Sequence, residues 1–249
     1  MTSPHIIESR SEGILSLTIS RPERRNSLTL DMYRALTDAL LAAHADKETR
    51  VVLISGDQGF FTAGNDLSEF VGYQKGGEFI ALNFLHAISS CRKPIAAAVE
   101  RGAVGVGATL LQHCDFVYAG RSTRFSLPFI NFGLCAEGGS TMLLGQGPLA
   151  RQAARWLMLG DAFTAEEALQ AGLITTVVND DTALEAAQQV AARLAAMSPQ
   201  ALQITKAMLR RARGPVHEVM TEEIDHFTDL LEGDEAQALL RKFTTKAKA

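Results

Sequence analysis

The stretch that most constrains this 249-residue chain is residues 95–107, I-A-A-A-V-E-R-G-A-V-G-V-G. A short β-rich apolar run gives way there to three glycines, and residues 108–113 continue with helical spacing. The pattern predicts a buried strand, a glycine-rich turn and a helix. Glycines let a backbone approach a ligand closely, and the free N–H groups of a first helical turn favour negative charge. We therefore expect a site for an anionic atom at this junction.

The segments on either side alternate between strand and helix patterns. Residues 5–10 and 14–20 predict a hairpin, 51–55 and 115–119 predict further strands, and 30–43 and 78–90 predict helices. Asp66 and Glu69 have the spacing of a capping box for a short helix. Strand, helix and strand in alternation indicate parallel strands joined by right-handed crossovers. The fold class predicted for this part is therefore α/β.

From Pro148 onward the pattern is mostly helical, with one short strand expected at residues 175–178. The predicted helices are 165–171, 182–196, 199–211, 215–231 and 234–243. We expect residues 1–195 to form a core and residues 196–249 a C-terminal helical region. Such a tail cannot easily hide its apolar faces alone, so it should pack on the α/β part or on a neighbouring subunit.

Composition excludes several classes of function. A net charge of -4 with 47% hydrophobic residues argues against a nucleic-acid-binding surface. The N-terminus lacks a secretory pattern, and no apolar run reaches membrane-spanning length. Three cysteines without metal-ligand spacing indicate reduced, mostly buried thiols. We expect a cytoplasmic protein without a membrane or nucleic-acid partner.

The glycine-rich junction does not fit the familiar nucleotide-binding motifs. A dinucleotide fingerprint starting at Gly105 and Gly107 would need glycine or alanine where Leu110 stands. No phosphate-binding loop of the type G-x-x-x-x-G-K-[ST] occurs. By itself, the junction fits a tight structural turn equally well.

Together with other stretches, the junction resembles the crotonase family, the enoyl-CoA hydratase/isomerase superfamily. The stretches that carry the resemblance are R-P-E-R-R-N-S-L (21–28), F-T-A-G-N-D-L (61–67), A-V-E-R-G-A-V-G-V-G (98–107), C-D-F-V-Y-A-G (114–120) and the helical tail. The resemblance implies a spiral core of β-β-α turns and a C-terminal helical region used in trimerisation, with trimers that often pair into hexamers. It also implies two backbone N–H groups that hold the thioester carbonyl of an acyl-CoA, with no metal or redox cofactor.

Position by position, the resemblance implies that these two N–H groups belong to Asn65 and Val106. Removing a proton from carbon 2 of an acyl thioester creates an enolate, and each preorganised donor to its oxygen is worth roughly 3–4 kcal/mol. For Arg24, Arg25 and Lys246, contact with the phosphates or adenine end of CoA and ordinary solvated charge are equally supported. The remaining substrate-binding positions that the resemblance implies are Ala63, Gly64, Asp66, Leu67, Gly105, Thr109, Phe129 and Phe132.

The general base decides which reaction follows. Hydratases of this family use two glutamates, and Thr109 and Phe129 stand at those positions here. Glu137 remains as a single carboxylate, in L-C-A-E-G-G-S-T (134–141). The chain thus resembles the peroxisomal-type Δ3,Δ2-enoyl-CoA isomerases, which carry G-N-D-L and a catalytic glutamate in a P-E-G-type loop, where Ala136 replaces the proline. Glu137 could move a proton from carbon 2 to carbon 4, with its pKa raised by an apolar surround of Phe129, Phe132 and Leu134.

Other interpretations stay open at this point. Within the family, the protein could be a hydratase or could use Glu137 for other enolate chemistry such as thioester hydrolysis. It could also be a non-catalytic acyl-CoA-binding scaffold. Glu137 could equally be an exposed glutamate in the first turn of a helix. His113 beside Asp115 suggests an acid–base pair, although its place at a helix-to-strand boundary favours a structural role.

Overall fold

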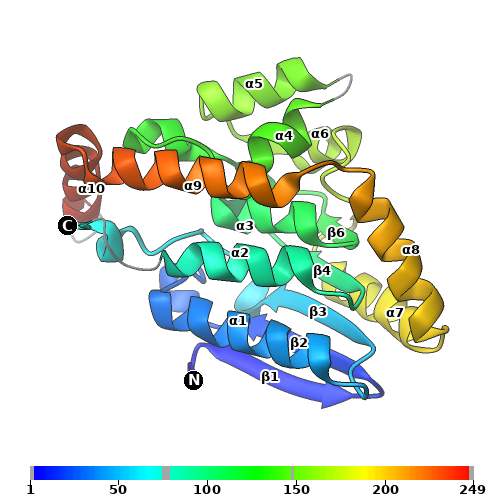
Figure 1. Cartoon of the computed structure of the whole chain (residues 1–249). Coiled ribbons are helices and arrows are strands. Elements are labelled where there is room, and N and C mark those ends of the chain that lie inside the picture. Colours follow the sequence, from blue (N-terminus) through cyan, green and yellow to red (C-terminus); the bar gives the residue numbers. More distant parts are fainter. Residues whose placement is uncertain (1–2, 75–78, 147–148, 247–249) are drawn as a thin grey trace.

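The computed structural model describes residues 3–74, 79–146 and 149–246 (Figure 1). Glu78 and Pro148, where a helix and the helical tail were expected to begin, lie outside these ranges. The strands are β1 (Ile6–Ser11), β2 (Ile14–Ile19), β3 (Val51–Gly56), β4 (Ile95–Val99), β5 (Gly102–Val104), β6 (Phe116–Gly120), β7 (Arg124–Ser126), β8 (Phe163–Thr164) and β9 (Thr176–Val178). The α-helices are α1 (Leu30–Ala45), α2 (Ile80–Ser90), α3 (Val106–Thr109), α4 (Ser140–Gly145), α5 (Ala150–Met158), α6 (Ala165–Gln170), α7 (Ala183–Ala195), α8 (Pro199–Arg211), α9 (Val216–Glu232) and α10 (Asp234–Lys246).

The main sheet has the strand order β1-β2-β3-β4-β6-β9. β1 and β2 form the predicted antiparallel hairpin, and every later neighbour is parallel. Parallel neighbours require crossover connections, which α1, α2 and the helices after β6 provide. The predicted α/β class is confirmed.

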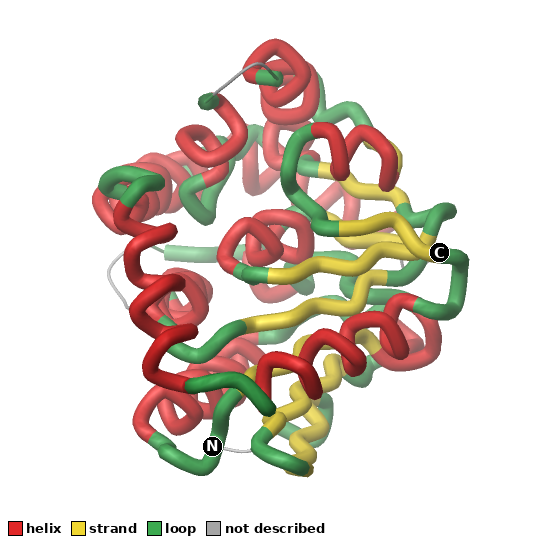
Figure 2. The backbone as a smooth tube through the Cα atoms, turned by 90° about the vertical axis from the view of Figure 1, so that its right-hand side faces the viewer, coloured by secondary structure: helices red, strands yellow, loops and turns green. Residues whose placement is uncertain are grey.

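Both faces of this sheet are covered, which explains the unbroken apolar runs of β3 and β4. Val51 and Leu53 pack with α7, whereas Val52 and Ile54 face the core that α1 and α2 share. Alternate side chains of a strand point to opposite faces, so a strand buried on both sides needs apolar residues at every position. Figure 2 shows the strands running side by side with helices on both sides.

A second sheet, of strand order β5-β7-β8, was not predicted. Its strands are only two or three residues long, which is too short for a period-2 pattern to emerge. The helices α4 and α5 were not predicted either. The second sheet matters because β5 leads directly into the glycine-rich turn at Gly105.

Two local predictions were wrong in detail. The helix after the turn is a single α-helical turn, α3, followed by a 3₁₀ turn over Leu110–His113, so its macrodipole is small. The capping box is only half formed. The Asp66 side chain accepts from Ser68 N at 3.1 Å, but Glu69 Oε2 accepts from Leu30 N at 2.7 Å instead of returning to Asp66.

The C-terminal helices pack on the α/β part, one of the two arrangements that the sequence allowed. Buried Lys206 of α8 bonds to Asp115 Oδ2 at 2.5 Å and to the Lys93 carbonyl at 2.6 Å. Arg210, one turn further along α8, donates to the carbonyl of Cys91 at 2.8 Å. Downstream, α9 packs against α2 and α4, and α10 lies against the 3₁₀ turns Leu67–Phe70 and Pro128–Phe132.

Two structural features are absent from the described residues. None of their helices is long and apolar enough to cross a bilayer. Within the same ranges, no group of three or more His, Cys, Asp or Glu side chains is arranged to hold a metal ion. The three cysteines are free, and two of them, Cys91 and Cys114, are buried as expected.

We expect Lys206→Met to destabilise the protein by about 3 kcal/mol, because the substitution leaves the Asp115 carboxylate without its buried partner. The midpoint of urea unfolding measures the change. Lys242→Met, at an exposed position of α10, is the matched control and should stay within about 0.5 kcal/mol of the wild type. Equal stability of the two variants would contradict this account of how α8 is held.

Candidate active site

The glycine-rich turn is brought together with the segment that follows β3. Thr62 forms a parallel bridge with Ala103 of β5, supported by bonds from Thr62 N to the Gly102 carbonyl and from Val104 N to the Thr62 carbonyl. Gly64, the residue before Asn65, lies close to the Val104 carbonyl, two residues before Val106. Two stretches far apart in the sequence therefore meet where the resemblance implied two backbone donors.

Glycine is required at two positions of this meeting point. Gly64 has φ +83°, and a Cβ there would lie 2.5 Å from the Val104 carbonyl oxygen. Gly105 has φ +54° and ψ -122°, a conformation that is essentially confined to glycine. The first glycine allows the close approach and the second turns the chain from β5 into α3.

The backbone N–H groups of Asn65 and Val106 are available as donors. Val106 is the first residue of α3, where an N–H has no acceptor within the helix. Asn65 is flanked by bonds from Leu28 N to the Gly64 carbonyl and from Asp66 N to the Leu28 carbonyl, which fix the strand around its own N–H. In residues 3–74, 79–146 and 149–246, neither donor has an acceptor.

Glu137 is buried beside this pair of donors, with 3% of its surface exposed. The interpretation of Glu137 as an exposed glutamate is therefore wrong. Its Oε1 accepts a hydrogen bond of 2.5 Å from the hydroxyl of Thr109, which also lies 3.4 Å from the Val106 carbonyl. One buried hydroxyl thus contacts both the carboxyl group and the turn that carries a donor.

Burial raises the pKa of Glu137 from 4.5 to about 8. The hydrogen bond from Thr109 lowers the pKa, and the negative charge of Glu223 raises it further. A carboxyl group with such a pKa can exchange a proton near neutral pH. Of the apolar residues expected around it, Phe129 and Leu134 are buried and Phe132 is partly exposed.

The turn that carries Glu137 is held by His113, and not by an acid–base pair of His113 with Asp115. The His113 Nε2 lies 2.8 Å from the Gly138 carbonyl, which can only accept, so this nitrogen carries the proton. Burial lowers the pKa of His113 to about 4, which keeps the ring neutral. Asp115 instead bonds to Ile95 N and Lys206, so the structural interpretation of His113 is supported.

Tyr33 of α1 adds a contact that the sequence did not predict. Its buried hydroxyl donates to the Asn65 side-chain oxygen, on the segment that presents the first donor. Burial raises the pKa of Tyr33 well above its ordinary value, and the charge of Glu137 raises it further. Tyr33 therefore stays protonated and connects α1 to the donor segment.

The residues expected to bind substrate fall into three groups. Gly64, Gly105, Thr109 and Phe129 are buried in or beside the donor region. Ala63, Asp66, Leu67 and Phe132 are partly exposed, and Asp66 is engaged in an ion pair with Arg21 at 2.7 Å. Arg24, Arg25 and Lys246 are exposed, the two arginines in one loop and the lysine at the end of α10.

Glu223 of α9 is the other group that the sequence did not single out. Its carboxylate bonds to the backbone just after Glu137 although 84 residues separate it from Gly139. The sequence holds one signal for a buried role of Glu223. This glutamate interrupts the apolar stripe that Met220, Ile224 and Phe227 form on the inner face of the helix.

Comparisons with known proteins agree with this geometry. An enoyl-CoA hydratase/isomerase family model matches residues 9–249. The chain is 35% identical to a 2,3-dehydroadipyl-CoA hydratase of Escherichia coli, with 84% of this chain and 82% of that protein covered. It is 30% identical to the human enoyl-CoA delta isomerase 2, with 88% of this chain but only 57% of that protein covered.

Solved structures give the same result. Pseudomonas aeruginosa OdaA superposes with a TM-score of 0.93 and 37% identity over 97% of this chain and 99% of that chain. An enoyl-CoA hydratase/isomerase from Pseudoalteromonas atlantica gives a TM-score of 0.88 and 35% identity over 97% of both chains. The match to the family model and the similarity to these solved structures place this chain in the enoyl-CoA hydratase/isomerase family, within the crotonase superfamily.

Proposed function

We propose that the protein is a Δ3,Δ2-enoyl-CoA isomerase in which Glu137 is the only acid–base group. The observation that carries this proposal is the buried Glu137 carboxyl beside the Asn65 and Val106 N–H groups, with Thr109 and Phe129 at the positions where hydratases carry glutamates. An allylic proton shift needs one group that takes a proton and returns it, whereas the usual hydration needs two carboxylates. Relatives named as enoyl-CoA delta isomerases support the proposal.

The proposed reaction begins when ionised Glu137 takes a proton from carbon 2 of a 3-enoyl-CoA. The electron pair moves into the thioester, and the dienolate oxygen accepts hydrogen bonds from the Asn65 and Val106 N–H groups. Glu137 then returns the proton at carbon 4, and the double bond comes to lie between carbons 2 and 3. The enzyme is unchanged, and the reaction as written uses no group beyond the substrate and these residues. CoA enters as part of the substrate.

Hydration of a 2-enoyl-CoA is the second candidate, because the Escherichia coli relative is named as a hydratase. Glu137 would then have to activate water alone. Other chemistry at the same site uses the same donors and the same carboxylate. In thioester hydrolysis, for example, Glu137 would activate water and the two N–H groups would bind the oxygen of the tetrahedral intermediate, from which the CoA thiol leaves. A non-catalytic scaffold would bind acyl-CoA without turnover.

We further propose that the protein assembles into trimers, which can pair into hexamers. Exposed apolar side chains on α8, namely Ile204, Met208 and Leu209, support an apolar contact along this helix. Arg24, Arg25 and Lys246 would bind the phosphates or adenine end of CoA from the surface of the molecule.

We expect Glu137→Gln to lower the rate of conversion of a 3-enoyl-CoA to its conjugated isomer by about 10²–10⁴-fold, because an amide cannot accept the proton. The absorbance of the conjugated thioester measures the rate. Glu218→Gln, an exposed glutamate of α9, is the control and should keep the wild-type rate. Hydration of a 2-enoyl-CoA that is unaffected by Glu137→Gln would reject the assignment, and acyl-CoA binding without any turnover would favour the scaffold.

The pH dependence should report the state of Glu137. Since the pKa of this carboxyl is raised to about 8 by burial, the base is mostly protonated at neutral pH. We expect kcat/KM to rise with pH to a plateau above that value, and to fall about tenfold for each pH unit below it. A profile of kcat/KM against pH with its acid limb near the ordinary carboxyl pKa of 4.5 would contradict this.

The same shift in pKa predicts that Glu137→Gln stabilises the fold. Between pH 4.5 and about pH 8, Glu137 holds a proton in the folded protein that it has lost in the unfolded chain. The free energy of unfolding therefore falls as the pH rises through this window. Glutamine carries no charge at any pH. The variant should therefore exceed the wild type in free energy of unfolding by on the order of 2–4 kcal/mol above pH 8, with little difference below the unfolded pKa. Denaturant unfolding across this pH range measures the gap, and a gap that does not vary with pH would refute the expectation.

A further inference from the structure

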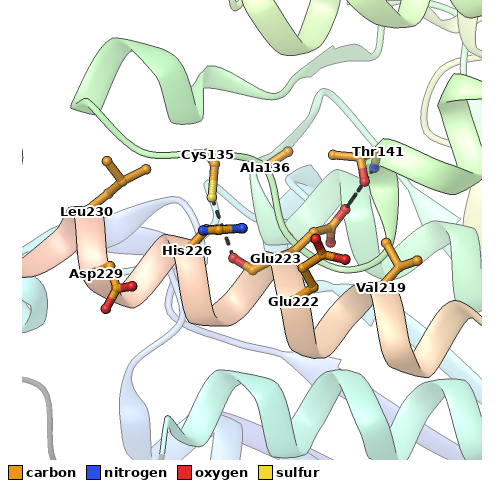
Figure 3. Close-up of a pocket in the computed structure, with 9 residues that line it drawn as sticks. All are labelled: Cys135, Ala136, Thr141, Val219, Glu222, Glu223, His226, Asp229 and Leu230. Atoms are coloured by element: carbon orange, nitrogen blue, oxygen red, sulfur yellow. Dashed lines mark hydrogen bonds between the residues drawn. The ribbon is translucent and has the colours of Figure 1, made fainter.

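Glu223 places a second buried carboxylate directly behind the turn that carries Glu137. Only 6% of its surface is exposed, although it lies on α9, which covers this side of the molecule. Its Oε2 accepts from Gly139 N at 2.6 Å, and its Oε1 accepts from Thr141 N at 2.9 Å and from the Thr141 hydroxyl at 2.5 Å. Figure 3 shows the Glu223 side chain reaching from α9 toward Thr141.

Other hydrogen bonds hold the same turn. The Ser140 hydroxyl donates to the Glu137 carbonyl at 2.5 Å, and His113 bonds to the Gly138 carbonyl. The N–H groups of Gly139 and Thr141 both donate to the Glu223 carboxylate. A shift of this turn would move the Glu137 carboxyl relative to the two donor N–H groups, and errors of about 1 Å in such placement can lower a rate by a hundredfold.

Glu223 supplies a negative charge near Glu137 in addition to these hydrogen bonds. Burial raises the pKa of Glu223, but its two oxygens accept hydrogen bonds from three donors, and these bonds favour the ionised carboxylate. Cys135, Glu222, His226 and Asp229 are the other titratable groups that line the cavity of about 500 Å³ beside it.

Among residues 3–74, 79–146 and 149–246, no compensating cation faces Glu137. The groups that face it are the Thr109 hydroxyl from α3, the Tyr33 hydroxyl from α1, Cys135 from its own loop and Glu223 from α9. None of these is positively charged. Glu223 is therefore the charge that faces the carboxyl of Glu137.

We propose that Glu223 is a positioning residue for Glu137: it fixes the turn from Glu137 to Thr141 and keeps a negative charge behind the base, which favours the protonated form of that base. This inference rests on the proposed function of Glu137 as a base. It goes beyond that function, because it assigns the control of the base to a residue that touches no reacting atom.

A purely structural role, in which Glu223 only anchors α4 to α9, makes a different prediction. Removing a structural anchor lowers activity by the same factor at every pH. Removing a positioning charge also makes Glu137 easier to ionise, so the acid limb of the pH profile moves to lower pH.

Glu223→Gln tests the proposal, because glutamine keeps the shape of the side chain but loses the charge and one of the two acceptors. Above the midpoint of the profile we expect kcat to fall about tenfold while KM changes less than about twofold, since placement of the base acts in the transition state. The midpoint itself should move down by roughly 1 pH unit. Glu222→Gln is the matched control, since it removes the neighbouring exposed charge of α9 without touching the turn, and it should leave kcat and the midpoint unchanged.

A readout that does not depend on turnover separates this proposal from the proposed function. The infrared band of the protonated Glu137 carboxyl is identified by its loss in Glu137→Gln, and its pH titration gives the midpoint in the free protein. If the band titrates at lower pH in Glu223→Gln but no isomerisation occurs, the function fails and the role of Glu223 stands. If the band titrates alike in Glu223→Gln, Glu222→Gln and the wild type, the role of Glu223 is overturned.

Thr141→Val keeps the test decisive if Glu223→Gln does not fold. This variant removes one of the three bonds and leaves the charge of Glu223 in place. We expect faster backbone amide exchange in residues 139–141 and a lower kcat, with the infrared midpoint unchanged. Wild-type exchange and wild-type kcat in Thr141→Val would overturn the positioning role.

Discussion

The arrangement depends on one buried hydrogen bond, from the Thr109 hydroxyl to the Glu137 carboxyl. An isolated carboxylate in an apolar interior is strongly disfavoured, so the group either finds donors or keeps its proton. In the part of the chain that the structure describes, it has one donor and no facing cation, and its raised pKa leaves it mostly protonated at neutral pH but able to ionise. The same threonine hydroxyl lies 3.4 Å from the Val106 carbonyl, so one side chain connects the acid to the segment that carries the Val106 N–H group.

The rest of the fold serves to keep this acid dry and fixed. The main sheet is covered on both faces, which makes β4 a rigid support for β5 and for the turn at Gly105, which follow it in the chain. The C-terminal helices cover the site on the side away from the main sheet. Phe227 of α9 packs with Phe70, Phe79 and Phe129. Gln237 of α10 donates to the Phe70 carbonyl at 3.0 Å. The helical tail is thus part of the site's wall, and its buried Glu223 lies within that wall.

Most of the fold could be predicted from the sequence because its long elements have clear periods. The strands of the main sheet and the helices α1, α6, α7, α8, α9 and α10 agree with the predicted ranges to within a few residues. The second sheet could not be predicted, since strands as short as Phe163–Thr164 have no period and form only because β7 lies beside them. For the site, family resemblance supplied Asn65, Val106 and Glu137, whose catalytic roles stay predictions. Tyr33 and Glu223 were missed because their partners are 32 and 84 residues away in the chain.

The charge state of His113 decides whether Glu137 can keep so high a pKa. The ring is bonded to the residue next to Glu137, so a protonated imidazole would put a positive charge against the same turn and favour the ionised acid. Burial prevents this by lowering the pKa of His113 to about 4, helped by the nearby positive charges of Arg210 and Arg213. These two arginines bond to backbone carbonyls, among them those of Cys91 and Gln112. Burial, with smaller contributions from Arg210 of α8 and from Arg213 just after it, therefore keeps the histidine neutral. The neutral histidine adds no charge to the surroundings of Glu137, where Glu223 is the charged neighbour.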